Sequence, residues 1–378
     1  MSRLEELIQQ HCPDGVEYKK LGDVCLMERG TSATKGTMQE GDIPVISGGR
    51  QPAFYCSQSN RTGETITVAG SGAGAGYVQY WDKPIFVCDA FSIKGNDSLN
   101  TKYIYYFLTS IQEKIYATKK GGGVPHVHIS SIDKFVIPVP PLPVQEEIVR
   151  ILDNFAELQA ELQAELQKRL QQYNYYRDNL LSFEGRTDIE WKKLGEIGKV
   201  CMCKRILKEQ TSSTGDIPFF KIGTFGGSAD AYISKELFDE YVKKYSYPKK
   251  GDILISAAGT IGRTVVFDGS PSYFQDSNIV WLKHDESVVL NSYLRYIYSL
   301  NPWAVSTGGT IARLYNDNIL NAVIPVPSLA EQQRIVDILD RFDKLTTDIT
   351  AGLPAEIEAR RKQYEYYRDQ LLTFKQKA

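Results

Sequence analysis

The chain is an internal duplication, and this limits its possible folds more than any other feature of the sequence. A repeat of this length indicates two equivalent structural units rather than one continuous core. Between the matched segments the two halves share only weak echoes, such as "GDIPVI" (41–46) and "GDIPFF" (215–220). The matched segments are "GVEYKKLGDV" (15–24) with "DIEWKKLGEI" (188–197), "VIPVPPLPVQEEIVRILDNF" (136–155) with "VIPVPSLAEQQRIVDILDRF" (323–342), and "QYNYYRDNLLSF" (172–183) with "QYEYYRDQLLTF" (363–374).

Each copy contains one long helical pattern. After Ile148, apolar residues continue at helical spacing in a narrow stripe as far as Tyr173, which is typical of a coiled-coil seam. The pattern predicts helices over 144–183 and 328–374. The second helix should begin with a capping box, Ser-x-x-Glu at 328–331. It should break near Gly352, because Pro354 follows.

The first helix carries the tetrapeptide Ala-Glu-Leu-Gln three times in tandem, at 156–167. Four residues slightly exceed one helical turn, so Leu158, Leu162 and Leu166 fall on nearly one face. One interpretation is padding made of good helix formers. The other is that the repeat sets the length of the helix, and so the spacing of whatever stands at its two ends.

The order of segments predicts the path of the chain. The first helix leads from one globular half to the other, so the second helix can pair with it along its length only by running back. We therefore expect an antiparallel coiled coil with a globular domain at each end and an approximate two-fold axis. Residues 1–14 should then lie near the C-terminus.

The globular halves, 1–143 and 185–327, are β-rich, with short strand-like runs such as "ETITVAG", "GDILISAAG" and "SNIVWLK". One helix per half is expected, at "LNTKYIYYFLTSIQEKIY" and "LNSYLRYIYSL". The predicted fold class is α+β, with two mixed domains joined by helical regions at 144–184 and 328–378.

Signatures of catalysis are missing from the sequence. It has neither the G-x-x-x-x-G-K-[ST] phosphate loop nor a G-x-S-x-G elbow. The run "GSGAGAG" (70–76) fits a relaxed dinucleotide pattern, but its β-rich context favours a loop between strands. Cys201-x-Cys203 and His126-x-His128 carry side chains that can bind a metal. For the cysteines, packing is the favoured role. The histidine pair has no counterpart in the second half. We expect recognition rather than catalysis, and no metal.

Composition and charge narrow the class of protein. Apolar and charged fractions are those of an ordinary soluble protein, and the N-terminus predicts neither a signal peptide nor a membrane span. The cysteines lack zinc spacing and indicate reduced thiols in a cytoplasmic protein. Residues 1–143 carry 14 basic and 14 acidic side chains, and residues 185–327 carry 17 and 15. A self-sufficient DNA-binding domain is usually more basic, so contact with a duplex would depend on local clusters of cations.

At "IPVPPLPVQEEIVRILD", "YNYYRDNLLSF" and their second copies, the sequence closely resembles the specificity (S) subunit of type I restriction-modification systems. The resemblance covers essentially the whole chain. It implies a non-catalytic subunit whose two target-recognition domains each read one half of a split double-stranded DNA sequence. It also implies that the helical regions hold these domains apart and dock two methyltransferase (modification) subunits. S-adenosylmethionine, ATP and Mg would bind to partner subunits, including restriction subunits that cleave DNA.

Two sets of candidate contact residues follow. The shared tyrosines and arginines of the helical repeats are expected at exposed positions on the methyltransferase-docking surface: Tyr175, Tyr176, Arg177, Tyr366, Tyr367 and Arg368. An equal alternative is that these tyrosines only seal the coiled coil. A Gly-rich polar loop precedes each long helix, and its residues are expected to contact DNA: Lys119, Lys120, Gly122 and His126 in the first half, and Thr307, Gly309 and Arg313 in the second. Clusters of cations elsewhere are expected to contact DNA as well: Lys204, Arg205, Lys243 and Lys244.

Two other classes of function remain open. One is a coiled-coil adaptor without a nucleic-acid role, and the other is a nuclease or methyltransferase with an unrecognised site.

Overall fold

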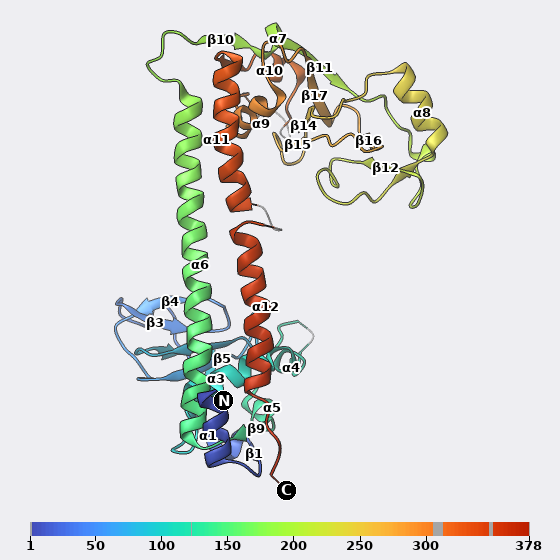
Figure 1. Ribbon diagram of the computed structural model, residues 1–378. Helices are drawn as coiled ribbons and strands as arrows, with labels where there is room; N and C mark the ends of the chain where they lie inside the picture. The colour runs from blue at the N-terminus through green and yellow to red at the C-terminus, as the bar shows by residue number, and fades with distance from the viewer. Residues whose placement is uncertain (1, 122, 305–312, 348–350, 378) are drawn as a thin grey trace. The chain divides into compact units, whose positions relative to one another are not determined.

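The computed structural model describes residues 2–121, 123–304, 313–347 and 351–377 (Figure 1). The chain divides into two compact units, each described by itself below. Unit 1 comprises Met1–Glu165 and Ala355–Ala378, and unit 2 comprises Leu166–Pro354. Each unit holds one globular half with the adjoining parts of the long helices. No helix among the described residues is both long and apolar enough to cross a membrane.

Both globular halves contain the same three sheets with the same strand order, which confirms the duplication. The orders are β2-β8-β5-β6, β4-β3-β7 and β1-β9 in the first half, and β11-β17-β14-β15, β13-β12-β16 and β10-β18 in the second. In both halves one strand pair of the three-stranded sheet is parallel, β3 with β7 and β12 with β16.

The first-half strands are β1 Glu17–Lys20, β2 Cys25–Arg29, β3 Ile43–Ile46, β4 Phe54–Cys56, β5 Thr65–Ala69, β6 Val78–Trp81, β7 Phe86–Val87, β8 Ala90–Gly95 and β9 Val136–Val139. The second-half strands are β10 Glu190–Lys193, β11 Gly198–Met202, β12 Ile217–Phe220, β13 Tyr232–Ile233, β14 Ile253–Ser256, β15 Thr264–Val266, β16 Tyr273–Phe274, β17 Ile279–His284 and β18 Val323–Val326. Strands β5 and β14 lie inside their sheets and are buried along their whole length, because their β-branched and apolar residues face packed layers on both sides. The expected loop at 70–76 connects β5 to β6.

The short helices contain both expected elements and one surprise. The expected pattern in the first half forms α3 and α4, and its counterpart forms α9. One helix per half was too few: α8 has no equivalent in the first half, and both halves contain further short turns of helix. The bounds are α1 Arg3–His11, α2 Leu21–Val24, α3 Thr101–Ser110, α4 Gln112–Tyr116, α5 Ile129–Ile132, α7 Leu194–Ile197, α8 Lys235–Lys244, α9 Asn291–Ser299 and α10 Asn316–Leu320, with the 3-10 helix η1 at Lys208–Gln210.

The long helical patterns form α6 (Leu142–Ser182), α11 (Leu329–Thr347) and α12 (Leu353–Leu371). Helix α6 is one helix of 41 residues, whereas the second pattern is interrupted. Ala351 and Gly352 lie in a turn and a bend just before α12, as the glycine and proline predicted. The capping box is half formed: Ser328 Oγ accepts the N–H of Glu331 at 3.3 Å, but the Glu331 carboxylate pairs with Arg334.

Within each unit, α6 packs antiparallel to a segment of the second pattern, as predicted (Figure 1). In unit 1 the Phe155 ring of α6 lies 5.6 Å from the Tyr367 ring of α12. In unit 2 the Tyr176 ring of α6 lies 5.5 Å from the Phe342 ring of α11. The stripe of Leu158, Leu162 and Leu166 is half-buried, while Glu157, Ala160, Glu161 and Gln163 around it are exposed.

The two ends of the chain meet in unit 1, as expected. The N–H of Val16 donates to the carbonyl of Lys375 at 2.9 Å, and the Tyr18 hydroxyl donates to the carbonyl of Phe374 at 2.8 Å. Leu4 and Leu372 belong to one apolar cluster. The first turns of the chain therefore complete the packing around the end of α12.

A buried glutamine attaches each globular half to its long helix; we call this contact the clasp. In unit 1, Gln145 of α6 is fully buried, and its amide oxygen accepts the N–H of Asn100, the N-cap of α3, at 2.8 Å. Its amide nitrogen donates to the carbonyls of Ser98 (2.9 Å) and Pro140 (2.6 Å). In unit 2, Gln332 makes the same set of bonds with Leu290 (2.9 Å), Val288 (3.0 Å) and Pro327 (2.8 Å).

A tyrosine–aspartate bond joins the same pair of helices as each clasp, α3 with α6 and α9 with α11. The Tyr106 hydroxyl of α3 donates to Asp153 of α6 at 2.5 Å, and Tyr296 of α9 donates in the same way to Asp340 of α11. Burial, followed by the bond to Asp153, raises the pKa of Tyr106 far above its usual value. The hydroxyl therefore stays protonated and remains the donor.

Replacing Gln145 by alanine is expected to loosen unit 1 alone. The change removes the partner of the buried Pro140 carbonyl and of two part-buried groups, the N–H of Asn100 and the carbonyl of Ser98. A buried group left unsatisfied costs about 1–3 kcal/mol. Amide hydrogen exchange in α3 should accelerate by at least about 30-fold, since about 2 kcal/mol corresponds to that factor. Exchange in α9 should stay the same, and Gln332→Ala should give the mirror result.

Gln333→Ala is the matched control, because Gln333 is exposed and bonds only to Asp337 among the described residues. Equal acceleration by Gln332→Ala and Gln333→Ala would contradict the role of the clasp.

Candidate nucleic-acid interface

The first half contains an open cleft of about 320 Å³, the first cleft. It lies where the end of β2, the turn before β8 and the segment before α5 come together. Gly30 makes this approach possible, because a Cβ there would stand 2.1 Å from the carbonyl oxygen of Cys88. The lining residues are Arg29, Gly30, Ser32, Gly70, Cys88, Asp89, Ala90, Phe91, His126, Val127, His128 and Ile129.

The second half contains a cleft of about 520 Å³ at the corresponding place, the second cleft. It is formed by the segment after β11, the turn before β17, and Arg313, which precedes α10. Its lining residues are Arg205, Ile206, Leu207, Lys208, Thr211, Phe219, Lys221, Ala231, Gln275, Asp276, Ser277, Asn278 and Arg313. One backbone plan thus carries two clefts with different side chains.

The structure brings several predicted DNA contacts to these clefts. His126 lines the first, and Arg205 and Arg313 line the second. Lys120 adjoins the first cleft, because its backbone exchanges hydrogen bonds of 2.8 and 2.9 Å with that of His126. Lys119 precedes it, with its ammonium 4.2 Å from the centre of the Tyr116 ring. Gly122, Thr307 and Gly309 lie outside the described residues.

Three other predicted lysines do not line the second cleft. The Lys204 ammonium lies over the Tyr245 ring at 5.2 Å. Lys243 and Lys244 end helix α8, where Lys244 pairs with Glu240 at 2.9 Å. Their role at DNA stays a prediction.

Sequence reasoning missed the acidic group of the first cleft and the acidic and amide groups of the second. Asp89 accepts a bond from Ser71 in the first, while Asp276 and Asn278 hold arginines in the second. The sequence suggests His128 only as a metal ligand, but in the structure its ring lies parallel to that of His126, 6.1 Å away. The clefts join segments far apart in sequence, and no local pattern reveals that they meet.

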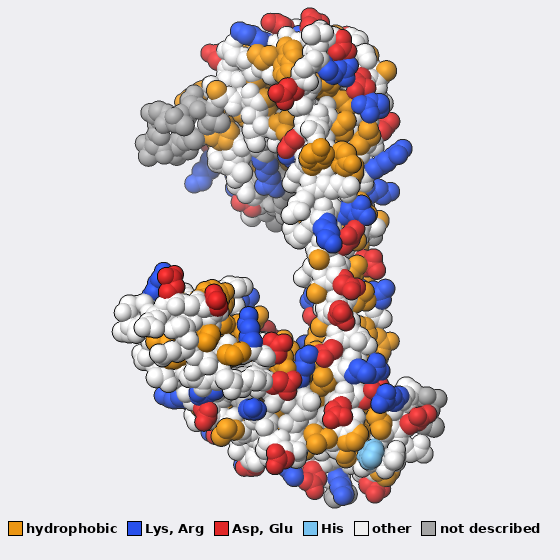
Figure 2. Space-filling view, turned by 90° about the vertical axis from the view of Figure 1, so that its left-hand side faces the viewer, with side chains coloured by type: hydrophobic (Ala, Val, Ile, Leu, Met, Phe, Trp, Pro, Cys, Tyr) orange, Lys and Arg blue, Asp and Glu red, His pale blue; other side chains and the backbone are white. Residues whose placement is uncertain are grey.

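The charges of the described surface are mixed. In the face drawn in Figure 2, acidic and basic side chains are interspersed, and neither sign covers a whole domain. The second cleft differs locally, because its lining includes four cations and one carboxylate. The local electrostatics thus favour an anionic or electron-rich ligand in the second cleft.

Metal-ligating groups form no cluster of three or more His, Cys, Asp and Glu side chains among the described residues. Burial raises the pKa of the Cys203 thiol to about 12, so this sulfur is protonated near neutral pH. Its surroundings are apolar, consistent with the packing role expected for Cys201-x-Cys203.

The tyrosines of the helical repeats divide into two kinds. Tyr176 and Tyr367 stack on the phenylalanine of the opposite helix and help to seal each pair. Tyr175 and Tyr366 project, with 66% and 62% of their surface exposed. Each meets its neighbouring tyrosine nearly edge-on, at 5.6 and 5.4 Å between ring centroids. The same exposed aromatic group therefore occurs once in each unit.

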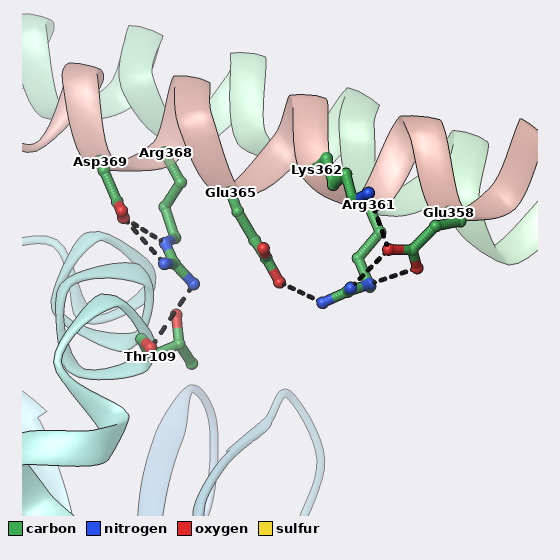
Figure 3. Close-up of polar contacts among 7 residues, drawn as sticks. All are labelled: Thr109, Glu358, Arg361, Lys362, Glu365, Arg368 and Asp369. Carbon is green, nitrogen blue, oxygen red and sulfur yellow. Dashed lines mark hydrogen bonds and ion pairs between the residues drawn. The ribbon is translucent and has the colours of Figure 1, made fainter. Parts of the chain in front are cut away.

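The arginines next to these tyrosines are not the exposed positions that the sequence suggested. Only 21% of the Arg177 side chain and 14% of the Arg368 side chain is exposed. Arg368 pairs with Asp369 at 2.8 Å and donates to the carbonyl of Thr109 at 3.5 Å (Figure 3). Arg177 pairs with Asp178 and lies over the Tyr173 ring. Both guanidiniums brace the chain itself. Figure 3 also shows Arg361 between Glu358 and Glu365, an exposed charge ladder along α12.

Comparison with known proteins agrees with this architecture. The family model of the type I restriction modification DNA specificity domain matches twice, over residues 13–172 and 187–359. A putative type I restriction enzyme specificity subunit from Haemophilus influenzae is 46% identical, over 95% of this chain and 96% of its own length. The specificity subunit of the Escherichia coli enzymes EcoR124I and EcoR124II is 33% identical, over 99% and 97%.

A solved structure supports the fold. The S subunit of a type I restriction-modification system from M. genitalium aligns with a TM-score of 0.57 at 19% identity, over 94% of this chain and 95% of that one.

Proposed function

Because the chain belongs to the type I restriction-modification DNA specificity family, whose specificity subunits recognise the DNA target and leave catalysis to other subunits, we propose that its two halves read the two parts of a bipartite target. One observation carries this proposal: the same sheets form a cleft at the same place in each half, but the cleft side chains differ. Equivalent scaffolds with different linings suit two different half-sites.

The long helices are proposed to set the spacer between the half-sites and to dock two methyltransferase subunits. The exposed Tyr175 and Tyr366 support this role, since two copies of one surface feature fit two identical partners. In this proposal S-adenosylmethionine, ATP and Mg bind to the partner subunits, restriction subunits join the same assembly, and the complex acts on cytoplasmic DNA.

Mapping of methylated bases tests the proposal. DNA exposed to this chain with its methyltransferase should carry methylation within two short sequence blocks separated by a spacer of fixed length and free sequence. Substitutions in one cleft should change one block only. A complex that assembles tightly but binds DNA without sequence preference would instead support the adaptor role.

Lys119→Ala with Lys120→Ala is expected to weaken DNA binding at every sequence alike. If both lysines neutralise phosphates, the slope of log affinity against log salt should become shallower by about 2, since each contact contributes about 0.9. Titration of a duplex at several salt concentrations measures this. Lys20→Ala with Lys134→Ala removes the same charge outside the cleft and should leave the slope unchanged. Indistinguishable slopes for the two double variants would show that Lys119 and Lys120 do not contact DNA.

A further inference from the structure

The second cleft holds two guanidinium groups, and one turn anchors both. Arg205 Nε donates to Asp276 Oδ2 at 3.0 Å, and Arg313 Nη2 donates to Asn278 Oδ1 at 2.7 Å. Asp276 and Asn278 flank Ser277, which has a φ of +54° in the turn before β17. This conformation, rare outside glycine, belongs to the turn from which both acceptors reach the cleft.

Within the part of the chain that the structure describes, the anchors leave most of each guanidinium available. A guanidinium carries five N–H donors, and the cleft acceptors take Arg205 Nε and Arg313 Nη2. The Arg205 side chain is 69% exposed, while its acceptor Asp276 is only 18% exposed. A largely buried acceptor thus holds Arg205 at Nε and restrains the orientation of its exposed donor fork.

From this geometry we propose that Arg205 and Arg313 each read a guanine in the half-site of the second domain, an assignment that rests on the proposed function. The planar fork of arginine matches the O6 and N7 acceptors of guanine in the major groove. A fixed orientation matters for reading a base edge, whereas a phosphate requires only a nearby positive charge. The Asp276 carboxylate would also repel a phosphate, but it tolerates the uncharged edge of a base.

The first cleft lacks this arrangement. Its Asp89 accepts a bond from Ser71 rather than from a guanidinium, and His126 and His128 stand where the second half has Arg313 and Tyr315. Guanine reading by an anchored arginine pair is therefore assigned to the second half-site alone.

Competition binding tests the assignment, with the full chain in complex with its methyltransferase. The probes are duplexes of the mapped target in which each base pair is changed in turn. The unmodified complex should prefer G·C by about 10- to 100-fold at one position for each arginine, the range of a good bidentate contact. Arg313→Gln should abolish that preference at one position and shift it toward A·T, because glutamine pairs with adenine. Arg205→Gln should do the same at a second position.

Two further variants separate reading from positioning and from charge. Asn278→Ala should weaken discrimination at the Arg313 position, and Asn278→Asp, which keeps an acceptor, should restore it. Lys208→Gln, in the same cleft, should lower affinity for all duplexes alike and preserve every preference. Thermal unfolding of each variant confirms that the domain is intact.

The outcomes separate this assignment from the function on which it rests. If the unmodified complex shows two blocks of sensitive positions but both arginine variants keep every preference, or behave like Lys208→Gln, the arginines are not base readers. If the unmodified complex shows one uninterrupted block or no preference, the bipartite function is refuted, and this assignment falls with it.

Discussion

Deleting residues 160–163 is expected to shorten the preferred spacer by about one or two base pairs and to leave both half-sites unchanged. The deletion removes one Ala-Glu-Leu-Gln copy from the unbroken helix α6. One copy corresponds to about 6 Å of helix, and a duplex rises about 3.4 Å per base pair. Four residues also turn the helix about 40° beyond a full turn. The second recognition domain is therefore expected to rotate as well as shift.

The effect on the original target should be large. A misplacement of ~1 Å can cost about 100-fold in rate, so methylation at the old spacing should fall by at least that factor. Mapping methylated sites for the deletion and for a chain with one added copy measures both directions.

Glu161→Ala with Gln163→Ala is the matched control, because it keeps the length and changes only exposed positions. An unchanged spacer in an active deletion variant would show that the repeat is padding.

Replacing Tyr175 and Tyr366 together by alanine is expected to abolish assembly with the methyltransferase at concentrations where the unmodified complex is intact. Exposed aromatic anchors at the centre of an interface are typically worth at least about 2 kcal/mol each, or about 30-fold in affinity. Each single variant should lose one partner and yield a complex with one methyltransferase. Native mass measurement distinguishes these species.

The controls separate docking from folding. Tyr175→Phe with Tyr366→Phe keeps the rings and should keep most of the affinity. Tyr55→Ala removes a tyrosine of similar exposure (53%) in the globular half and should have no effect. Full assembly of the double alanine variant would show that the docking surface does not depend on these residues.

The repeated segments made the framework predictable, because identical residues make identical contacts. The pattern around Ile148 predicted the helix, and the repeat of Gln145 as Gln332 corresponds to a repeated set of three hydrogen bonds. The break at Gly352 followed from local backbone chemistry alone. Such features depend on neighbours in sequence or on an internal copy.

Helix α8 was missed although its signal is present. Ser234 caps it by accepting the N–H of Leu237 at 3.3 Å, and Leu237, Phe238 and Tyr241 form one half-buried face. The first half has no counterpart of this helix, so the internal repeat gives no second copy from which to predict it.

The clefts themselves were beyond sequence reasoning. The charge and position of Arg205 and Arg313 predicted them as DNA contacts, but nothing in the sequence predicted that Asp276 and Asn278 would anchor them. Only the pairing of β17 with β11 and β14 brings that turn to the cleft. Local periodicity reports which face of a strand is buried, and it does not report which distant turn stands beside it.

The clasp has a consequence for how such a chain can change over generations. Among the described residues, the side chains of Gln145 and Gln332 bond only to main-chain groups of the globular halves. These bonds therefore place no demand on side-chain identity at Ser98, Asn100, Val288 or Leu290. Substitutions elsewhere in a reader leave this joint untouched as long as the turn before α3 or α9 keeps its path. Mutation can therefore explore new cleft linings while the joint to the long helix is inherited intact.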